Sequence, residues 1–228
     1  MNVLYFLRKR TKFIRRFYEN AGEPFHATIR KIDAGEAPFD APPYDEDQDG
    51  EPPFMEEWDE ANTALEMLGR SCISMLSASL QLYFKTWESE IGIVWEPGER
   101  ERLFKKGFLP AYRKCFGDVL NLSWDDCKLD FEIIEQVVLA RNRDQHPECI
   151  STMRLTHALK DLQKHPQPFF ISDHEQKMFF DPDMAGISWM RPTLHVSSDT
   201  MVAAIKEVEL LCEWMEERML AAKYSMRG

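Results

Sequence analysis

The sequence has no Cys-x-x-Cys pair, although it contains five cysteines in 228 residues. An odd number of cysteines without that spacing argues against a disulfide framework and against a zinc site. The cysteines are Cys72, Cys115, Cys127, Cys149 and Cys212. We therefore expect reduced thiols, as in a cytoplasmic protein.

Two glycine-containing signatures are also missing. The sequence has no Gly-x-x-x-x-Gly-Lys-Ser/Thr loop, whose backbone amides would bind nucleotide phosphates. It also has no Gly-x-Ser-x-Gly turn, which would expose a nucleophilic serine. These absences argue against ATP hydrolysis and against serine hydrolysis.

Long hydrophobic runs are absent as well. No apolar stretch approaches the roughly 20 residues that a helix needs to span a bilayer. The positive charges between Arg8 and Arg16 follow a short apolar patch instead of preceding a long one, which argues against a signal peptide. We therefore expect a cytoplasmic protein with no membrane partner.

Positive charge is scarce, because 28 Lys and Arg stand against 39 Asp and Glu, for a net charge of −11. This balance opposes binding to a phosphate backbone, since that affinity depends mostly on cations. The distribution is uneven: residues 1–18 carry six basic side chains and no acid, whereas residues 45–60 carry nine acids and no base. Mutual neutralisation of the two segments is one interpretation that the sequence leaves open.

The chain is expected to divide near residue 55. Residues 3–18 have the pattern of a basic amphipathic helix, and residues 36–54 combine five prolines with acids, as linkers do. The helix could bind RNA or an anionic surface, but packing on its own protein is the favoured interpretation. We expect a helix and linker in residues 1–55 and a helical domain in residues 56–228.

The acidic linker has the spacing of a calcium-binding loop. The stretch from Asp45 to Gly50, with Glu56 at the twelfth position, matches the EF-hand pattern of oxygen ligands and a sharp turn. Pro52 and Pro53 remove two backbone donors from that loop. An acidic linker is therefore favoured over a calcium site.

Apolar residues recur at helical spacing through most of the second part of the chain. The expected helices cover residues 58–90, 99–116 with a break at Pro110, a segment from Ser123 to just before His146, 152–164, and a last helix from Asp199. The period changes between residues 168 and 197, where residues 169–171, 178–180 and 193–196 are expected to form short strands. The predicted fold class is all-α, a helical bundle with a small β-strand insertion near the C-terminus.

The segment from Arg141 to His146 closes an apolar run, and Pro147 follows it. Arg141 continues the apolar stripe of Ile134 and Val138, so its charge must reach solvent, a partner or an interface. One interpretation is structural: an Arg paired with an acid, and a His that stabilises the negative end of the helix dipole. The other is that the two side chains act on a phosphate.

This segment resembles the signature of the HEPN superfamily (higher eukaryotes and prokaryotes nucleotide-binding domains). In that signature an Arg is followed by a polar residue, often Asn, and by a His four to six residues after the Arg. Arg141, Asn142 and His146 match it, and the resemblance covers about residues 56–223. It implies RNA cleavage without a metal or cofactor, at a site shared by two protomers of a homodimer. In bacteria such proteins commonly act as toxins or in phage defence, which implies a possible cognate antitoxin.

The resemblance also implies a role for each residue. His146 would take a proton from a ribose 2′-hydroxyl or give one to the leaving 5′-oxygen. Arg141 would hold two oxygens of the transition state, and Asn142 would position the substrate phosphate or Arg141. The expected function is a metal-independent endoribonuclease. The alternative is a catalytically silent HEPN-like helical module that binds a protein or nucleotide partner, and the net charge of −11 is its best support.

Overall fold

The computed structural model describes residues 2–40, 50–146, 153–180 and 191–225, and this part of the chain is all-α, as predicted. It contains eight helices and no strand. The helices are α1 (Val3–Ala34), α2 (Met55–Ile91), α3 (Glu99–Phe104), α4 (Phe108–Leu120), α5 (Phe131–Gln145), α6 (Leu159–Lys164), α7 (Asp173–Phe180) and α8 (Ser198–Ser225).

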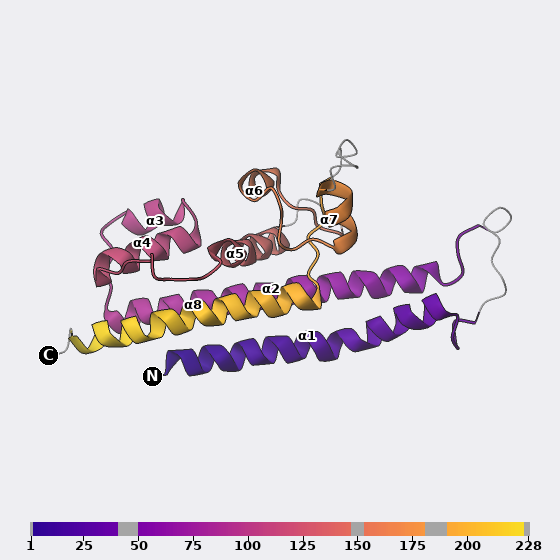
Figure 1. Ribbon diagram of the computed structural model, residues 1–228, viewed down its shortest axis with the longest axis horizontal. Coiled ribbons are helices and arrows are strands. Elements are labelled where there is room, and N and C mark those ends of the chain that lie inside the picture. The colour runs from indigo at the N-terminus through magenta and orange to yellow at the C-terminus, as the bar shows by residue number, and fades with distance from the viewer. Residues whose placement is uncertain (1, 41–49, 147–152, 181–190, 226–228) are drawn as a thin grey trace.

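Three long helices form the frame of the molecule. Figure 1 shows α1, α2 and α8 running along its length, with α3 to α7 gathered on the side of α2 and α8 that faces away from α1. The buried positions of α1 recur every three or four residues, as in helices that pack along a shared seam. They are Val3, Leu7, Thr11, Ile14, Tyr18 and Gly22. The basic helix therefore packs on its own protein, in the same apolar core as α2 and α8.

Two of the three long helices lie where the sequence predicts them, whereas α1 continues to Ala34, beyond the expected residues 3–18. The helix expected at residues 58–90 is α2, which ends at Gly92 in the left-handed conformation that glycine adopts without strain. The apolar stripe expected after Asp199 is buried in α8, from Met201 to Met219. A 3.6-residue period sustained over many turns identifies such helices without tertiary information.

The helical segment at residues 99–116 is divided, but not at Pro110. The break between α3 and α4 lies at residues 105–107, where Gly107 has a φ of 118°. Pro110 belongs to the first turn of α4, where its missing N–H removes no helical hydrogen bond. The glycine, rather than the proline, divides the segment.

The helix expected to begin at Ser123 begins instead at Phe131. Asp130 caps α5 by accepting hydrogen bonds from the backbone N–H groups of Glu132 and Ile133. The Ser123 hydroxyl accepts a hydrogen bond from the backbone N–H of Asp125, which closes a local turn. Both residues are good cap formers, and only Asp130 immediately precedes the apolar stripe.

The helix expected at residues 152–164 is reduced to the short α6. Before α6 the chain is extended, and the backbone N–H of His157 donates to the carbonyl of Pro192 at 3.0 Å. The carbonyl of Leu155 accepts from the backbone N–H of Leu194 at 2.7 Å. These long-range bonds take backbone groups that a helix would otherwise use.

The β-strand insertion expected at about residues 168–197 is wrong for the part that the structure describes. Residues 178–180 belong to α7, and the other two expected strands form no ladder; a single bridge joins Thr156 and Thr193. The Ser172 hydroxyl caps α7 by accepting from the backbone N–H of Glu175. A short apolar run beside a helix cap is compatible with helix or strand, and the cap decides it here.

The structure describes only some of the residues behind the remaining predictions, which concern the cysteines, the calcium-loop pattern and membrane spans. Cys72, Cys115, Cys127 and Cys212 are buried free thiols, and Cys149 lies outside the described residues. The calcium-loop pattern at residues 45–49 also lies outside them, and Glu56 belongs to the first turn of α2. None of the described helices combines the length and the apolar composition of a membrane span.

Candidate functional site at the end of helix α5

Arg141 and Asn142 are joined by a hydrogen bond near the end of α5. The Arg141 guanidinium donates from Nη1 to Asn142 Oδ1 at 3.0 Å. Arg141 is partly exposed, but its Nε is buried and has no hydrogen-bond partner among the described residues. The guanidinium thus donates one side-chain hydrogen bond, while its buried Nε has no acceptor among the described residues.

His146 follows the last residue of α5. Its φ of −129° and ψ of 64° lie outside the helical region, and its side chain is exposed. No hydrogen bond or ion pair links His146 to Arg141 in the described part of the chain. Five residues of helix separate positions by about 7.5 Å along the axis, so the two side chains begin well apart.

Two of the residues between them, Arg143 and Asp144, contact other parts of the molecule, whereas Asn142 and Gln145 are exposed. Arg143 Nε donates to the carbonyl of Thr156 at 2.7 Å. Asp144 accepts a hydrogen bond from the Ser74 hydroxyl at 2.8 Å. These two contacts join the end of α5 to α2 and to the extended segment before α6. The structure therefore fixes the helix end on which Arg141, Asn142 and His146 stand.

A buried arginine that the sequence analysis did not single out lies behind this helix end. Arg70 of α2 is only 5% exposed, and its Nη2 donates to the carbonyl of Met153 at 3.1 Å. Its Nε lies 3.6 Å from Asp144 Oδ1, and its Nη1 lies 3.9 Å from Glu66 Oε2. Because two carboxylates flank it, the buried charge is balanced.

Glu66 extends this charged cluster to the start of α8. His195 Nδ1 lies 2.5 Å from Glu66 Oε1, and this hydrogen bond raises the pKa of His195 above its ordinary value. Gly69, the residue before Arg70, lets α2 approach the segment that contains His195. A Cβ at Gly69 would lie 2.9 Å from the Cβ of Val196, which is too close. The sequence signal that could have identified this cluster is the spacing of Glu66 and Arg70, since a Glu and an Arg four residues apart on a helix can pair.

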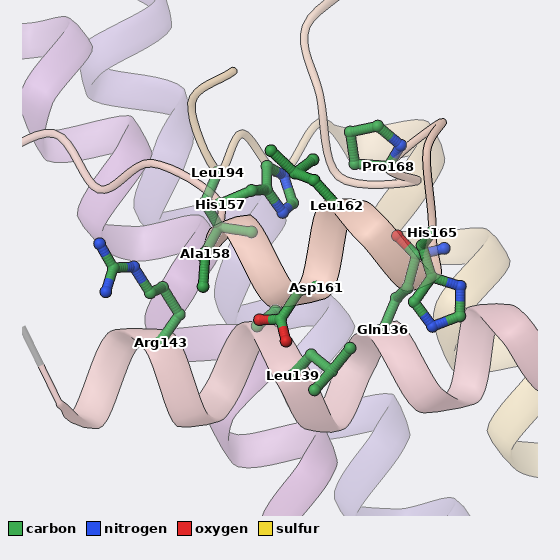
Figure 2. A pocket seen from close by; sticks show the side chains of 11 residues that line it. Gln136, Leu139, Arg143, His157, Ala158, Asp161, Leu162, His165, Pro168 and Leu194 are labelled. Carbon is green, nitrogen blue, oxygen red and sulfur yellow. The ribbon is translucent and has the colours of Figure 1, made fainter. Parts of the chain in front are cut away.

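A small cavity lies between α5 and α6 (Figure 2). Figure 2 shows Arg143 and His165 toward opposite ends of it, with Asp161 between them. Its volume of about 20 Å³ is enough for about one water molecule. It is too small for a nucleotide, so we interpret it as a packing defect.

Two histidines line this cavity. His157 Nε2 lies 2.9 Å from the carbonyl of Phe170, and burial lowers the pKa of His157. His165 is buried, and neither of its ring nitrogens makes a hydrogen bond in the described structure. Its nearest acid is Glu135, whose Oε2 lies 3.5 Å from Nε2. The contact with the carbonyl of Phe170 gives His157 a structural role.

A larger hollow of about 660 Å³ lies at the opposite end of α5, where the N-termini of α5, α7 and α8 meet. Four acids are among the residues that line it: Asp130, Glu132, Asp173 and Asp199. Acidic side chains repel phosphate, so this hollow is a poor site for RNA. The candidate site therefore remains the Arg141 end of the helix.

Within the described residues, no group of three or more His, Cys, Asp or Glu side chains is arranged to hold a metal ion. Comparisons with protein-family models, with curated proteins and with solved structures found no significant match to this chain. The resemblance to the HEPN superfamily therefore depends on the sequence motif alone, and membership stays a prediction.

Proposed function

We propose that the protein is a metal-independent endoribonuclease that uses Arg141 and His146, with Asn142 as a positioning residue. The observation that carries the proposal is the Arg141 guanidinium, which is held by Asn142 and keeps a buried Nε without a partner at the helix end that exposes His146. A fixed cation and an exposed imidazole are the two groups that cleavage by a neighbouring 2′-hydroxyl requires.

The chemistry follows from the two side chains. His146 accepts the proton of the 2′-hydroxyl as its oxygen attacks phosphorus, or it donates a proton to the leaving 5′-oxygen, and water makes the other proton transfer. Arg141 neutralises the charge that develops on the phosphoryl oxygens. The product is a 2′,3′-cyclic phosphate. Since no contact joins the two side chains in one chain, a homodimer would let the Arg of one protomer serve the His of the other.

The direct test is incubation of the wild-type protein and of His146→Ala with total RNA in excess EDTA, followed by end-group analysis. We expect wild-type cleavage to leave cyclic-phosphate ends and the variant to lose about 10²-fold or more of the rate. His174→Ala removes another exposed histidine, on α7, and serves as the matched control. Equal cleavage by wild type and His146→Ala would refute the assignment.

A second candidate function is a catalytically silent module that binds a partner. The net charge of −11 and the acidic lining of the hollow of about 660 Å³ favour it, because an acidic body binds RNA poorly. A salt titration of RNA binding separates the two functions. Phosphate contacts at a ribonuclease site lose affinity steeply with salt, whereas a silent module shows no salt-dependent RNA binding.

A further inference from the structure

A groove between α1 and α2 exposes apolar side chains on the outer face of the molecule. It has a volume of about 460 Å³, and its lining includes Phe6, Phe13, Ile14, Met75 and Ala78. The side chains of Phe6 and Phe13 are 55% and 61% exposed. Further along the same edges, Phe17 and Leu82 are 40% and 48% exposed. Large apolar side chains grouped in this way mark a surface that binds something.

The two helix segments that form this groove contain no acid. Residues 1–18 and 67–87 have no Asp or Glu, in a chain with 39 acids, and of their eight basic side chains Arg8 and Arg70 pair with acids away from the groove. Lys9 and Arg10 line the groove, and Arg10 Nε donates to the Ser79 hydroxyl on α2 at 3.2 Å. The groove is therefore apolar with a basic rim, in a protein that is otherwise strongly acidic.

The opposite side of α1 shows what such a basic helix binds in this protein. There α8 packs against both α1 and α2. Arg8 of α1 pairs with Glu213 of α8 at 2.7 Å, and the Thr11 hydroxyl donates to Glu209. The backbone N–H of Leu4 donates to Glu216 at 3.3 Å. An apolar helix with acids along its edges thus fills one side of the α1–α2 pair, while the other side is open.

We propose that the open groove binds an acidic amphipathic helix of a partner protein. From Phe6 to Phe17 the exposed stripe spans about 16 Å, or three turns of a bound helix. The apolar floor takes a row of leucine-like side chains, and Lys9 and Arg10 meet acids on the flanks. The inference does not depend on ribonuclease activity, because the groove uses none of Arg141, Asn142 or His146.

Three other occupants fit the groove less well. A second copy of this chain using the same face would place its basic rim against an identical rim, because two-fold contacts are isologous. A bilayer is flat and would leave the concave floor between Phe6 and Phe13 uncovered. RNA bases could stack only on Phe6 and Phe13, because the aliphatic floor of Ile14, Met75 and Ala78 offers them neither stacking nor hydrogen bonds.

The test uses a fluorescent 18-residue peptide with leucine at the first and fourth positions of each heptad and glutamate or alanine elsewhere. We expect saturable binding to the full-length protein by fluorescence anisotropy. The double variant Phe6→Ala/Phe13→Ala and the charge variant Lys9→Glu/Arg10→Glu should each weaken binding about tenfold or more. Tyr224→Ala removes a 69% exposed aromatic side chain from α8 and should leave binding unchanged.

Equal binding of a scrambled peptide of the same composition, or undiminished binding by the two double variants, would overturn the proposal. Phosphatidylserine vesicles and a uridine 20-mer are the competing probes. Tighter binding of either probe than of the peptide, lost in Phe6→Ala/Phe13→Ala, would reassign the groove to lipid or RNA. The altered side chains are exposed or at the rim, and circular dichroism melting checks that each variant is folded.

Discussion

The guanidinium of Arg70 lies between Glu66 and Asp144 in an almost fully buried position, so its removal should leave two carboxylates facing each other. We expect Arg70→Ala to lower the free energy of unfolding by about 3 kcal/mol, measured by urea denaturation with circular dichroism. Arg70→Met keeps the apolar stem and should cost less, since part of the loss in Arg70→Ala is packing. Two variants as stable as wild type would show that the buried charge contributes nothing to stability.

The raised pKa of His195 leads to a prediction about how the stability of the protein depends on pH. Its hydrogen bond to Glu66 raises its pKa above 6.5, so the folded state binds the proton more tightly than the unfolded chain. The stabilisation is complete below pH 6.5 and is lost as pH rises through the folded value. We therefore expect the difference in unfolding free energy between wild type and His195→Gln to be larger at about pH 6 than at about pH 9.

The pKa of His157 is shifted in the opposite direction from that of His195, so the two residues change stability with pH in opposite senses. The experiment therefore compares two proteins that both contain His157. Burial lowers the pKa of His157, so its contribution is lost as pH falls. It is the same in wild type and in His195→Gln, and it cancels in the difference. Glu66→Gln should remove most of the pH effect of His195. A difference between wild type and His195→Gln that does not vary with pH would contradict the prediction.

The sequence identifies unusual residues better than it identifies their partners. Arg141 was recognisable because a charge interrupts an apolar stripe, and its partner is the adjacent Asn142. Glu66 and His195 are 129 residues apart, and no local pattern predicts that they meet. For the same reason, the sequence motif alone says nothing about whether Arg141 and His146 converge.

At the level of secondary structure, the capping of α7 by Ser172 is a testable cause of its helical conformation. Ser172→Ala removes the acceptor for the backbone N–H of Glu175 and should lower the unfolding free energy by about 1 kcal/mol. Ser172→Asp keeps an acceptor at the cap and should retain most of the stability. Hydrogen exchange of the α7 amides gives the local measurement. Unchanged protection in Ser172→Ala would show that tertiary contacts hold α7 without the cap.

Helix length separates the correct predictions from the wrong ones. The period of α2 and α8 is sustained over many turns, so local sequence determines them. The helices α6 and α7 have six and eight residues, too short for a period to be distinguished from a strand. Glu175 of α7 accepts from both the backbone N–H and the hydroxyl of Thr193, and that contact exists only after the chain folds.

For the whole molecule, charge and assembly decide whether the proposed ribonuclease site can exist. The acidic hollow of about 660 Å³ lies at the end of α5 away from Arg141, and the net charge of −11 opposes binding of a phosphate backbone. A second protomer would instead supply a second cation at the same place. The proposal therefore requires a homodimer, and light scattering should give twice the mass of 26.8 kDa.

Mixing two inactive variants tests whether the site is shared between protomers. A heterodimer of Arg141→Ala and His146→Ala retains one site with both side chains, because each variant supplies the residue that the other lacks. Random exchange makes half of the dimers heterodimers, each with one of its two sites intact. We therefore expect about a quarter of the wild-type cleavage rate to return on mixing. Exchange confirmed by energy transfer, without recovered cleavage, would show that Arg141 and His146 do not act across a dimer interface.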